Sequence, residues 1–162
     1  MKQNFKVPIA GYGITLTEIP GEIALYFEVG NCECHCKGCH SNYLWDTNLS
    51  TPMKNPEYIF NIVRKYKDDV TAILFMGGNR NGMDFLTFLE EVVKPIKENT
   101  YKDIGIYLGS WEALDVSYAA TYCRWIKVGR YQKDKGGLDS PITNQLFLEV
   151  QNYNFLKGKE DK

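Results

Sequence analysis

The chain has 162 residues, a length that suits one domain, and its 44% hydrophobic and 14% aromatic content excludes a disordered protein. With 19 basic and 20 acidic residues the formal net charge is -1, so no broad positive field favours a nucleic acid partner. The N-terminus lacks the apolar run of a secretory signal, and no stretch approaches the roughly 20 apolar residues of a membrane span, so we expect a cytoplasmic protein without a membrane partner.

The first half of the chain alternates predicted strands and helices around a cysteine-rich loop. Residues 22–29 have the period of a strand and lead directly into that loop. A helix is predicted to begin at Asn55-Pro56, since asparagine caps free amides and proline suits the first helical turn. Residues 70–76 are apolar on both faces and end at Gly77-Gly78, as expected for a central parallel strand before a ligand loop.

The second half continues this alternation. Apolar residues at helical spacing predict a helix over residues 85–96, which Pro95 should kink or end near Val93. Strands are predicted at residues 104–108 and 124–128, with a short helix around 111–122 between them and a last edge strand at 146–150.

The order of these elements predicts the fold class. Strands separated by helices imply right-handed crossovers, so we expect an α/β fold with a mostly parallel sheet, in the form of an open, incomplete (β/α) barrel. We expect a single domain over residues 1–150 and a polar, mobile tail over residues 151–162.

The cysteine loop concentrates the chemistry of the chain. Four of the five cysteines lie within eight residues and give a C-x3-C-x2-C spacing, with Cys34 inside the first gap. The thiolates of Cys32, Cys36 and Cys39 can hold three corners of a 4Fe-4S cube and leave the fourth iron open to a substrate. Cys34 lies two residues from two of these cysteines, an awkward separation for a ligand of the same cube, so we interpret it as a bystander.

A structural zinc site is the alternative for the same loop. Zinc would use all four cysteines in a tetrahedral shell, but such sites normally gather two ligand pairs from separate parts of the chain. The only two histidines, His35 and His40, belong to the same loop, so nothing distant completes a second pair. The spacing therefore favours the cluster. The fifth cysteine, Cys123, is interpreted as a buried small hydrophobic residue.

The cysteine loop after a first strand resembles that of the radical S-adenosylmethionine (SAM) superfamily. The stretches ITLTEIPGEIALYFEVGN, CKGCHSNYLW, ILFMGG and GGLDSPITNQ further resemble the anaerobic ribonucleotide reductase activating proteins, from about residue 14 to residue 145. This resemblance implies a radical SAM oxidoreductase in which a reduced 4Fe-4S cluster cleaves SAM, and the 5'-deoxyadenosyl radical removes a hydrogen atom from a glycine of the reductase large subunit. It also implies an electron donor such as a flavodoxin-type reductant.

The resemblance also implies which residues contact SAM. Gly77 and Gly78 match the glycine pair that meets the SAM amine, where the absence of a Cβ gives access to the backbone, although an ordinary strand-to-helix turn is the alternative. Gly109 is expected on the same rim. His40 could touch the adenine or lie on the loop surface, and the GGLDSP stretch could close over the site or form a surface turn.

Two positions depart from the family pattern. The family has an acidic residue after the glycine pair, whereas this chain has Asn79, followed by Arg80, so a charge-assisted contact to the SAM ammonium becomes neutral at a cost of about 1 kcal/mol. Asn31 separates Gly30 from Cys32, where relatives commonly have glycine directly before the first cysteine.

Two other functions remain as alternatives. One is a radical SAM enzyme that acts on a small molecule, and the other is a zinc-binding interaction module without enzymatic activity. An open barrel favours a large protein partner over a small molecule, because something must cover the site if a reactive radical is to be kept from solvent.

Overall fold

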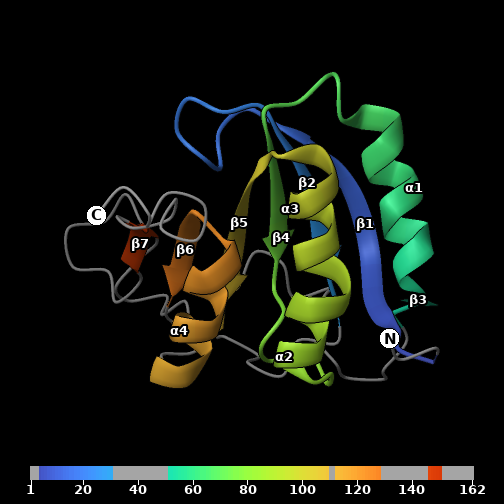
Figure 1. The fold of residues 1–162 in the computed structure, drawn as a ribbon, viewed down its shortest axis with the longest axis vertical. Coiled ribbons are helices and arrows are strands. Elements are labelled where there is room, and N and C mark those ends of the chain that lie inside the picture. The colour runs from blue at the N-terminus through green and yellow to red at the C-terminus, as the bar shows by residue number, and fades with distance from the viewer. Residues whose placement is uncertain (1–3, 31–50, 110–111, 129–145, 151–162) are drawn as a thin grey trace.

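The computed structural model describes residues 4–30, 51–109, 112–128 and 146–150. Within them, seven strands form one open sheet in the order β3-β1-β2-β4-β5-β6-β7 (Figure 1). The strands are β1 (Val7–Thr15), β2 (Ala24–Val29), β3 (Met53–Lys54), β4 (Ala72–Met76), β5 (Asp103–Leu108), β6 (Trp125–Val128) and β7 (Leu146–Glu149).

The centre of the sheet is parallel and its borders are antiparallel. Strands β2, β4, β5 and β6 run parallel to one another, with Phe27 beside Phe75 and Phe75 beside Ile106. β1 and β7 close the parallel set with antiparallel pairing to β2 and β6. The five predicted strands are confirmed to within two residues at each end, as is the α/β class with its largely parallel, unclosed sheet.

Strands β1 and β3 were not predicted from the sequence. β1 contains two glycines, and both lie under side chains of β2: a Cβ on Gly11 would come within 2.9 Å of Oε1 of Glu28, and one on Gly13 within 2.8 Å of the Tyr26 hydroxyl. The glycines therefore give these β2 side chains room over β1 at the expense of the apolar alternation that marks a strand.

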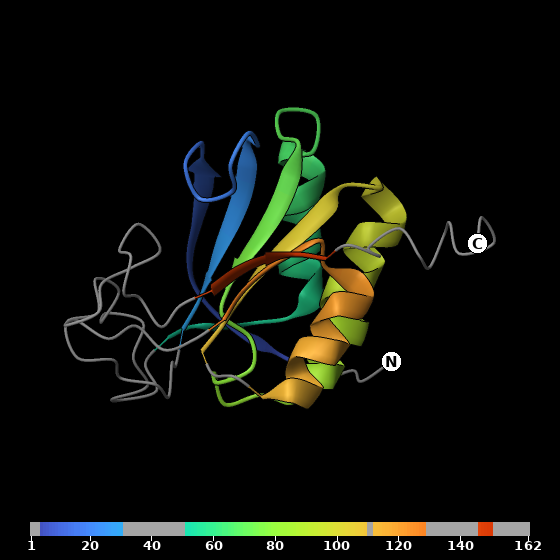
Figure 2. The same cartoon turned by 90° about the vertical axis from the view of Figure 1, so that its left-hand side faces the viewer.

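All described helices lie on one face of the sheet, as Figure 2 shows. Helix α1 (Pro56–Tyr66) begins where predicted, and the Asn55 side chain accepts a hydrogen bond from the Tyr58 amide at 3.0 Å. The others are α2 (Phe85–Phe88), the π-helical turn η2 (Leu89–Val93), α3 (Lys94–Thr100) and α4 (Ala113–Tyr122).

The main core lies between these helices and the sheet. The ring of Phe75 stacks on Phe27 of the neighbouring strand with centroids 5.4 Å apart and meets the edge of Phe88 from α2 at 5.3 Å. All three side chains are fully buried. Large apolar side chains in contact on both sides of the interface fix α2 against the central strands.

Pro95 explains an irregularity in the long helical segment. The regular α-helix is interrupted before Pro95, as expected, but the helical path does not end at Val93 and continues to Thr100. The Lys94 amide donates to the carbonyl of Leu89, five residues back. Since proline lacks an amide hydrogen and its ring crowds the carbonyl four residues earlier, the turn before it widens to the π form.

The helix-free face carries a smaller apolar cluster and a polar group. Ile19, from the β1–β2 connection, lies over Gly105, where a Cβ would come within 3.0 Å of its Cδ1 atom. Nearby, the Tyr107 hydroxyl donates a hydrogen bond to the Glu18 carboxylate. The Nζ atom of Lys127 lies 3.7 Å from the centre of the Tyr107 ring. The β1–β2 connection thus covers part of the face that the described helices leave open.

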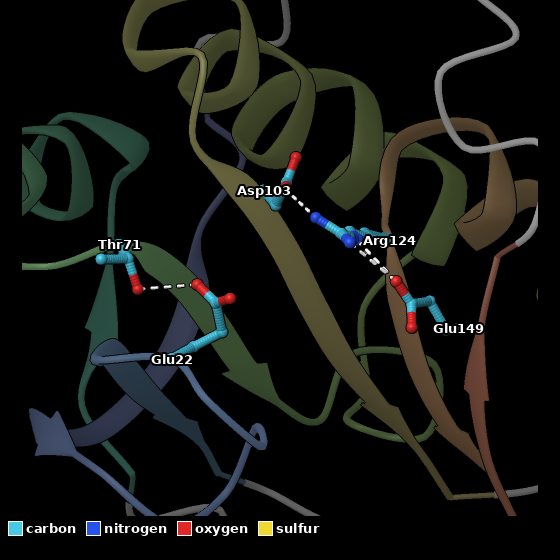
Figure 3. Close-up of polar contacts among 5 residues, drawn as sticks. All are labelled: Glu22, Thr71, Asp103, Arg124 and Glu149. Atoms are coloured by element: carbon cyan, nitrogen blue, oxygen red, sulfur yellow. Dashed lines mark hydrogen bonds and ion pairs between the residues drawn. The ribbon is translucent and has the colours of Figure 1, made fainter.

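Two groups of polar contacts, around Thr71 and around Arg124, lie at the amino-terminal ends of the parallel strands (Figure 3). Thr71, before β4, donates to Glu22, before β2, at 2.7 Å. Arg124, before β6, pairs with Asp103 of β5 at 2.7 Å and with Glu149 of β7 at 2.8 Å. The hydrogen bonds that Arg124 donates to these two carboxylates raise the pKa of its guanidinium. Among the described residues no helix is both long and apolar enough to cross a membrane.

Candidate functional site

The opposite edge of the sheet carries the predicted ligand residues. Strands β2, β4 and β5 are parallel neighbours, so their carboxyl ends share one edge. Gly30 follows β2, Gly77-Gly78 follow β4, and Gly109 follows β5. The carboxyl edge of a parallel sheet is where ligands of open α/β folds bind, which makes this edge the candidate site.

The segment that contains the cysteine loop, residues 31–50, starts and finishes at one corner of this edge. Before it, the Gly30 amide donates to the carbonyl of Pro8 at 2.9 Å; after it, the Ile9 amide donates to the carbonyl of Pro52 at 3.0 Å. A Cβ on Gly30 would lie 2.3 Å from Oγ1 of Thr51. We call these contacts the stem of the segment. Because Gly30 and Thr51 are packed together, the stem requires glycine at position 30.

The glycine pair has a backbone that other residues rarely adopt. The φ angles of Gly77 and Gly78 are +128° and +154°. A Cβ on Gly77 would approach Val29 to 3.1 Å, and one on Gly78 would approach Phe85 and the ring of Phe88 to within 3.2–3.3 Å. Conformation and packing therefore both demand glycine here, and the bare backbone is what allows the chain to turn at the end of β4.

Asn81 connects the glycine pair to the end of β2. Its side chain is buried, with 4% exposed. Its Oδ1 accepts from the Gly78 amide at 2.8 Å, while Nδ2 donates to the carbonyls of Val29 at 3.0 Å and Gly30 at 2.7 Å. The loop after β4 is thus tied by one side chain to the residues that immediately precede the cysteine segment.

Asn79 makes the corresponding connection toward β5 and α4. Its Oδ1 accepts from the Gly109 amide at 3.0 Å, and its Nδ2 donates to Oδ2 of Asp115 at 3.0 Å. Asp115 lies in the first turn of α4 and is partly buried. The Asp115 carboxylate is therefore hydrogen-bonded to Asn79, at the position where the activating proteins that this chain resembles have an acidic residue.

The structure brings four of the predicted residues to this edge: Gly77, Gly78, Asn79 and Gly109. The predicted cluster ligands Cys32, Cys36 and Cys39 lie outside the described residues, as do Cys34, His40, the GGLDSP stretch and the tail over residues 151–162. Their assignments stay predictions. In the described ranges alone, no group of three His, Cys, Asp or Glu side chains could hold a metal ion.

Cys123 is the one cysteine that the structure describes. It is fully buried at the end of α4, which confirms its interpretation as a small hydrophobic residue. Burial raises the pKa of its thiol, an effect that the nearby charge of Lys97 partly opposes. A thiol held protonated in an apolar setting is a poor nucleophile and a poor metal ligand.

Sequence reasoning missed Asn81, Thr51 and Asp115. Asn81 stands in the polar run NRNG after the glycine pair, a composition that predicts a loop but gives no sign of a buried amide. Thr51 and Asp115 are ordinary loop and helix-start residues in the sequence. Their roles depend on contacts with residues 21 and 36 positions away, which no local pattern encodes.

The comparison with known families decides the class of the site. The sequence model of the family described as "4Fe-4S single cluster domain" matches residues 11–137. The chain belongs to this family. The matched range contains the second half of β1, strands β2 to β6, the glycine pair and the cysteine segment, so it covers most of the candidate site. A comparison with curated proteins gives no match.

The residues of the chain suit the cluster of this family. Three closely spaced thiolates are the donor set that a 4Fe-4S cluster takes, and the residues that flank their segment, Gly30 and Thr51, meet at the carboxyl end of β2. Membership in a 4Fe-4S family favours iron-sulfur over zinc for this segment. The chain is therefore an iron-sulfur protein with an open α/β fold.

Proposed function

We propose that this chain is a radical SAM activating enzyme that generates a glycyl radical on an anaerobic ribonucleoside-triphosphate reductase. The observation that carries the proposal is a C-x3-C-x2-C segment, in a 4Fe-4S family member, whose stem ends beside a glycine pair at the carboxyl edge of a parallel sheet. The parallel strands β2, β4, β5 and β6 support the finer fold assignment, an incomplete barrel of the radical SAM type.

Each part of the site has a role in this proposal. Cys32, Cys36 and Cys39 hold three irons, and the backbone of Gly77 and Gly78 meets the SAM amine. When bound, the reduced cluster and SAM would together supply the one-electron chemistry that converts a glycine of the partner into a glycyl radical. The protein binds, orients and shields these groups.

Asn79 acts differently from what the sequence resemblance implies. Its side chain already bonds the Gly109 amide and Asp115. Its first role in this proposal is therefore to connect the end of β4 to the end of β5 and to the start of α4. We include Asp115 in the candidate site. Its carboxylate offsets part of the negative charge that is lost because position 79 is an asparagine and not an acidic residue. Gly109 and His40 stay assigned to the SAM side of the site.

The decisive experiment is anaerobic reconstitution of the chain with iron and sulfide, followed by SAM and dithionite. We expect about four irons and four sulfides per chain, as a single 4Fe-4S cluster requires, and formation of 5'-deoxyadenosine measured by liquid chromatography. A variant with Cys32, Cys36 and Cys39 all replaced by alanine is the control and should yield none. Failure of the loaded wild-type protein to cleave SAM would rule out the proposed chemistry.

A second measurement separates the proposed partner from the alternatives. Mixing the loaded enzyme with the reductase large subunit should give a glycyl radical, which electron paramagnetic resonance (EPR) detects as a doublet. SAM cleavage without this radical would favour a small-molecule substrate. One zinc per chain in protein prepared without oxygen, with neither iron nor sulfide, would establish the interaction module instead. The helix-free face supports a protein partner, since no described helix covers it.

A further inference from the structure

A single buried amide joins the two parts of the proposed site. Asn81 bonds the Gly78 amide through its oxygen and the carbonyls of Val29 and Gly30 through its nitrogen, at 2.7–3.0 Å. The orientation of the amide is determined by these partners. A reversed amide would set its oxygen against two carbonyls and an N–H against another N–H, so three favourable contacts would become repulsive.

The partners of Asn81 belong to the two pieces that must act together. Gly78 is in the glycine pair proposed to meet SAM. Gly30 is the last described residue before the cysteine segment and stands two positions before Cys32. The end of β2, which leads into the cysteine segment, is therefore held against the loop after β4 by the hydrogen bonds of Asn81.

The packing around Asn81 leaves little room for this loop to shift. The Cβ position on Gly77 lies 3.2 Å from both polar atoms of the Asn81 amide and 3.1 Å from Cβ of Val29. The Asn81 amide thus occupies the space that a side chain on Gly77 would take, and a shorter side chain at position 81 would leave both space and unsatisfied carbonyls behind. The loop could then move relative to β2.

We propose that Asn81 is a positioning residue that holds the end of β2, at Val29 and Gly30, against the glycine pair and thereby sets the affinity for SAM. The inference deepens the proposed function and rests on it. It differs from a role in stability alone, because stability requires only that the buried carbonyls be satisfied. Positioning additionally requires that ligand binding at the edge respond when the connection is removed.

The test compares Asn81→Ala with wild-type protein, both loaded with the cluster without oxygen. Iron and sulfide content, the thermal midpoint, and the EPR spectrum of the reduced cluster during titration with SAM are measured. We expect cluster loading within the error of wild type and a SAM dissociation constant raised about tenfold or more, the effect of losing one or more buried hydrogen bonds. The SAM-induced change in the spectrum should also differ in shape.

Asn55→Ala is the matched control. Asn55 also uses its side-chain oxygen on a backbone amide, that of Tyr58, but it caps α1 and lies in neither of the two pieces that Asn81 joins. This variant should lose thermal stability while it keeps the wild-type SAM affinity. If Asn81→Ala behaves in the same way, with SAM affinity within twofold of wild type, the positioning role is wrong.

Two further outcomes are also decisive. Asn81→Ser keeps one hydroxyl and more of the volume, and replaces Asn81→Ala if the latter does not fold. Failure of both to fold, while Asn55→Ala folds, would show that Asn81 serves stability and would overturn the inference. A loaded wild-type protein whose EPR spectrum ignores SAM would overturn the proposed function first, and that result is visible without any variant.

Discussion

At the scale of single residues, the candidate site depends on glycines at positions where neighbouring side chains leave no room for a Cβ. Gly78 combines a φ of +154° with a Cβ position 3.2–3.3 Å from three core side chains, and Gly30 would place a Cβ within 2.3 Å of Thr51. In both cases the missing side chain leaves room for neighbouring side chains to pack directly against the glycine backbone. Substitution there should affect the site and the fold together.

We predict that Gly78→Ala lowers the free energy of unfolding by about 1–3 kcal/mol, because strain at positive φ adds to crowding against Phe85 and Phe88. Urea denaturation measures the change. Gly21→Ala is the control, since Gly21 has a φ of +79° but nothing within 4 Å of its Cβ position, so it shows the effect of strain alone. An equal loss in the two variants would show that the contacts contribute nothing.

We predict that alanine at Cys32, Cys36 or Cys39 abolishes the cluster, because each removes one of three thiolate ligands. Cys34→Ala should retain it. Iron and sulfide analysis after anaerobic reconstitution, together with the visible absorption of the cluster, checks both statements. Loss of iron in the Cys34 variant would show that the ligand set has been assigned wrongly.

Part of the site could be predicted at this scale and part could not. The cysteine spacing and the glycine pair stand out because chemistry demands rare residues at short separations. Asn81 does not stand out, since an asparagine in a polar loop is common and its three partners come from Gly78 and from two residues more than fifty positions earlier. Burial of its amide follows only from the assembled sheet.

At the scale of elements, the sheet has one edge that holds it together and another that carries the site. The ion pairs of Arg124 join β5, β6 and β7 at the amino-terminal edge of the parallel strands (Figure 3). The Arg124 guanidinium also lies 4.9 Å from the centre of the Trp125 ring. Edge strand β7 pairs only with β6 in the described sheet. Its attachment should therefore depend on this side chain.

We predict that Arg124→Ala loosens β7 without unfolding the sheet. The pairs are partly exposed, so their contribution is about 1 kcal/mol, and amide hydrogens of β7 should exchange about fivefold faster. Amides of β4 at the sheet centre should keep their exchange rates and serve as the internal control. Equal acceleration in both strands would mean that Arg124 stabilises the whole domain.

The elements were predictable where one face or both faces are apolar. β4 is buried on both faces, and β2 alternates cleanly, so both were identified. β1 was missed because Pro8, Gly11 and Gly13 break its alternation, although the glycines are what Glu28 and Tyr26 need beneath them. The two-residue strand β3 is too short for any periodic signal, and the π turn before Pro95 reflects a backbone adjustment that propensity does not specify.

At the scale of the whole molecule, the described helices cover one face of the sheet and leave the other face to shorter segments (Figure 2). On that second face Tyr107 is largely buried, and burial together with its hydrogen bond to Glu18 raises the pKa of its hydroxyl. On the helix side, burial raises the pKa of Cys123. The Tyr107 hydroxyl and the Cys123 thiol, on opposite sides of the sheet, are thus both held in their protonated, uncharged forms.

We predict that the chain loses stability in alkaline solution. The unfolded chain releases these protons above about pH 8.5 for cysteine and about pH 10 for tyrosine, whereas the folded chain keeps them. The unfolded state then binds fewer protons, so the free energy of unfolding falls as pH rises, by at most about 1.4 kcal/mol per pH unit for each group. Urea midpoints between pH 7.5 and 10.5 measure this slope.

Cys123→Ala provides the comparison for this prediction. Without the buried thiol, the slope between pH 8.5 and 10 should be shallower, whatever the variant does to stability at neutral pH. An unchanged slope in that interval would mean that the thiol ionises as easily in the folded chain as in the unfolded one. The remaining slope above pH 10 then reports on Tyr107.

The stem at Gly30 and Thr51 has a consequence for how such a protein can diverge. Because both anchors meet at one corner, the span of chain between them can be lengthened, trimmed or exchanged with little change in closure entropy, which grows only slowly with length. A change in the length of this span leaves the strand order and pairing of the sheet as they are. Redox-active inserts from distant relatives could therefore be grafted onto this scaffold, and chimeras should fold wherever the two anchor residues are kept.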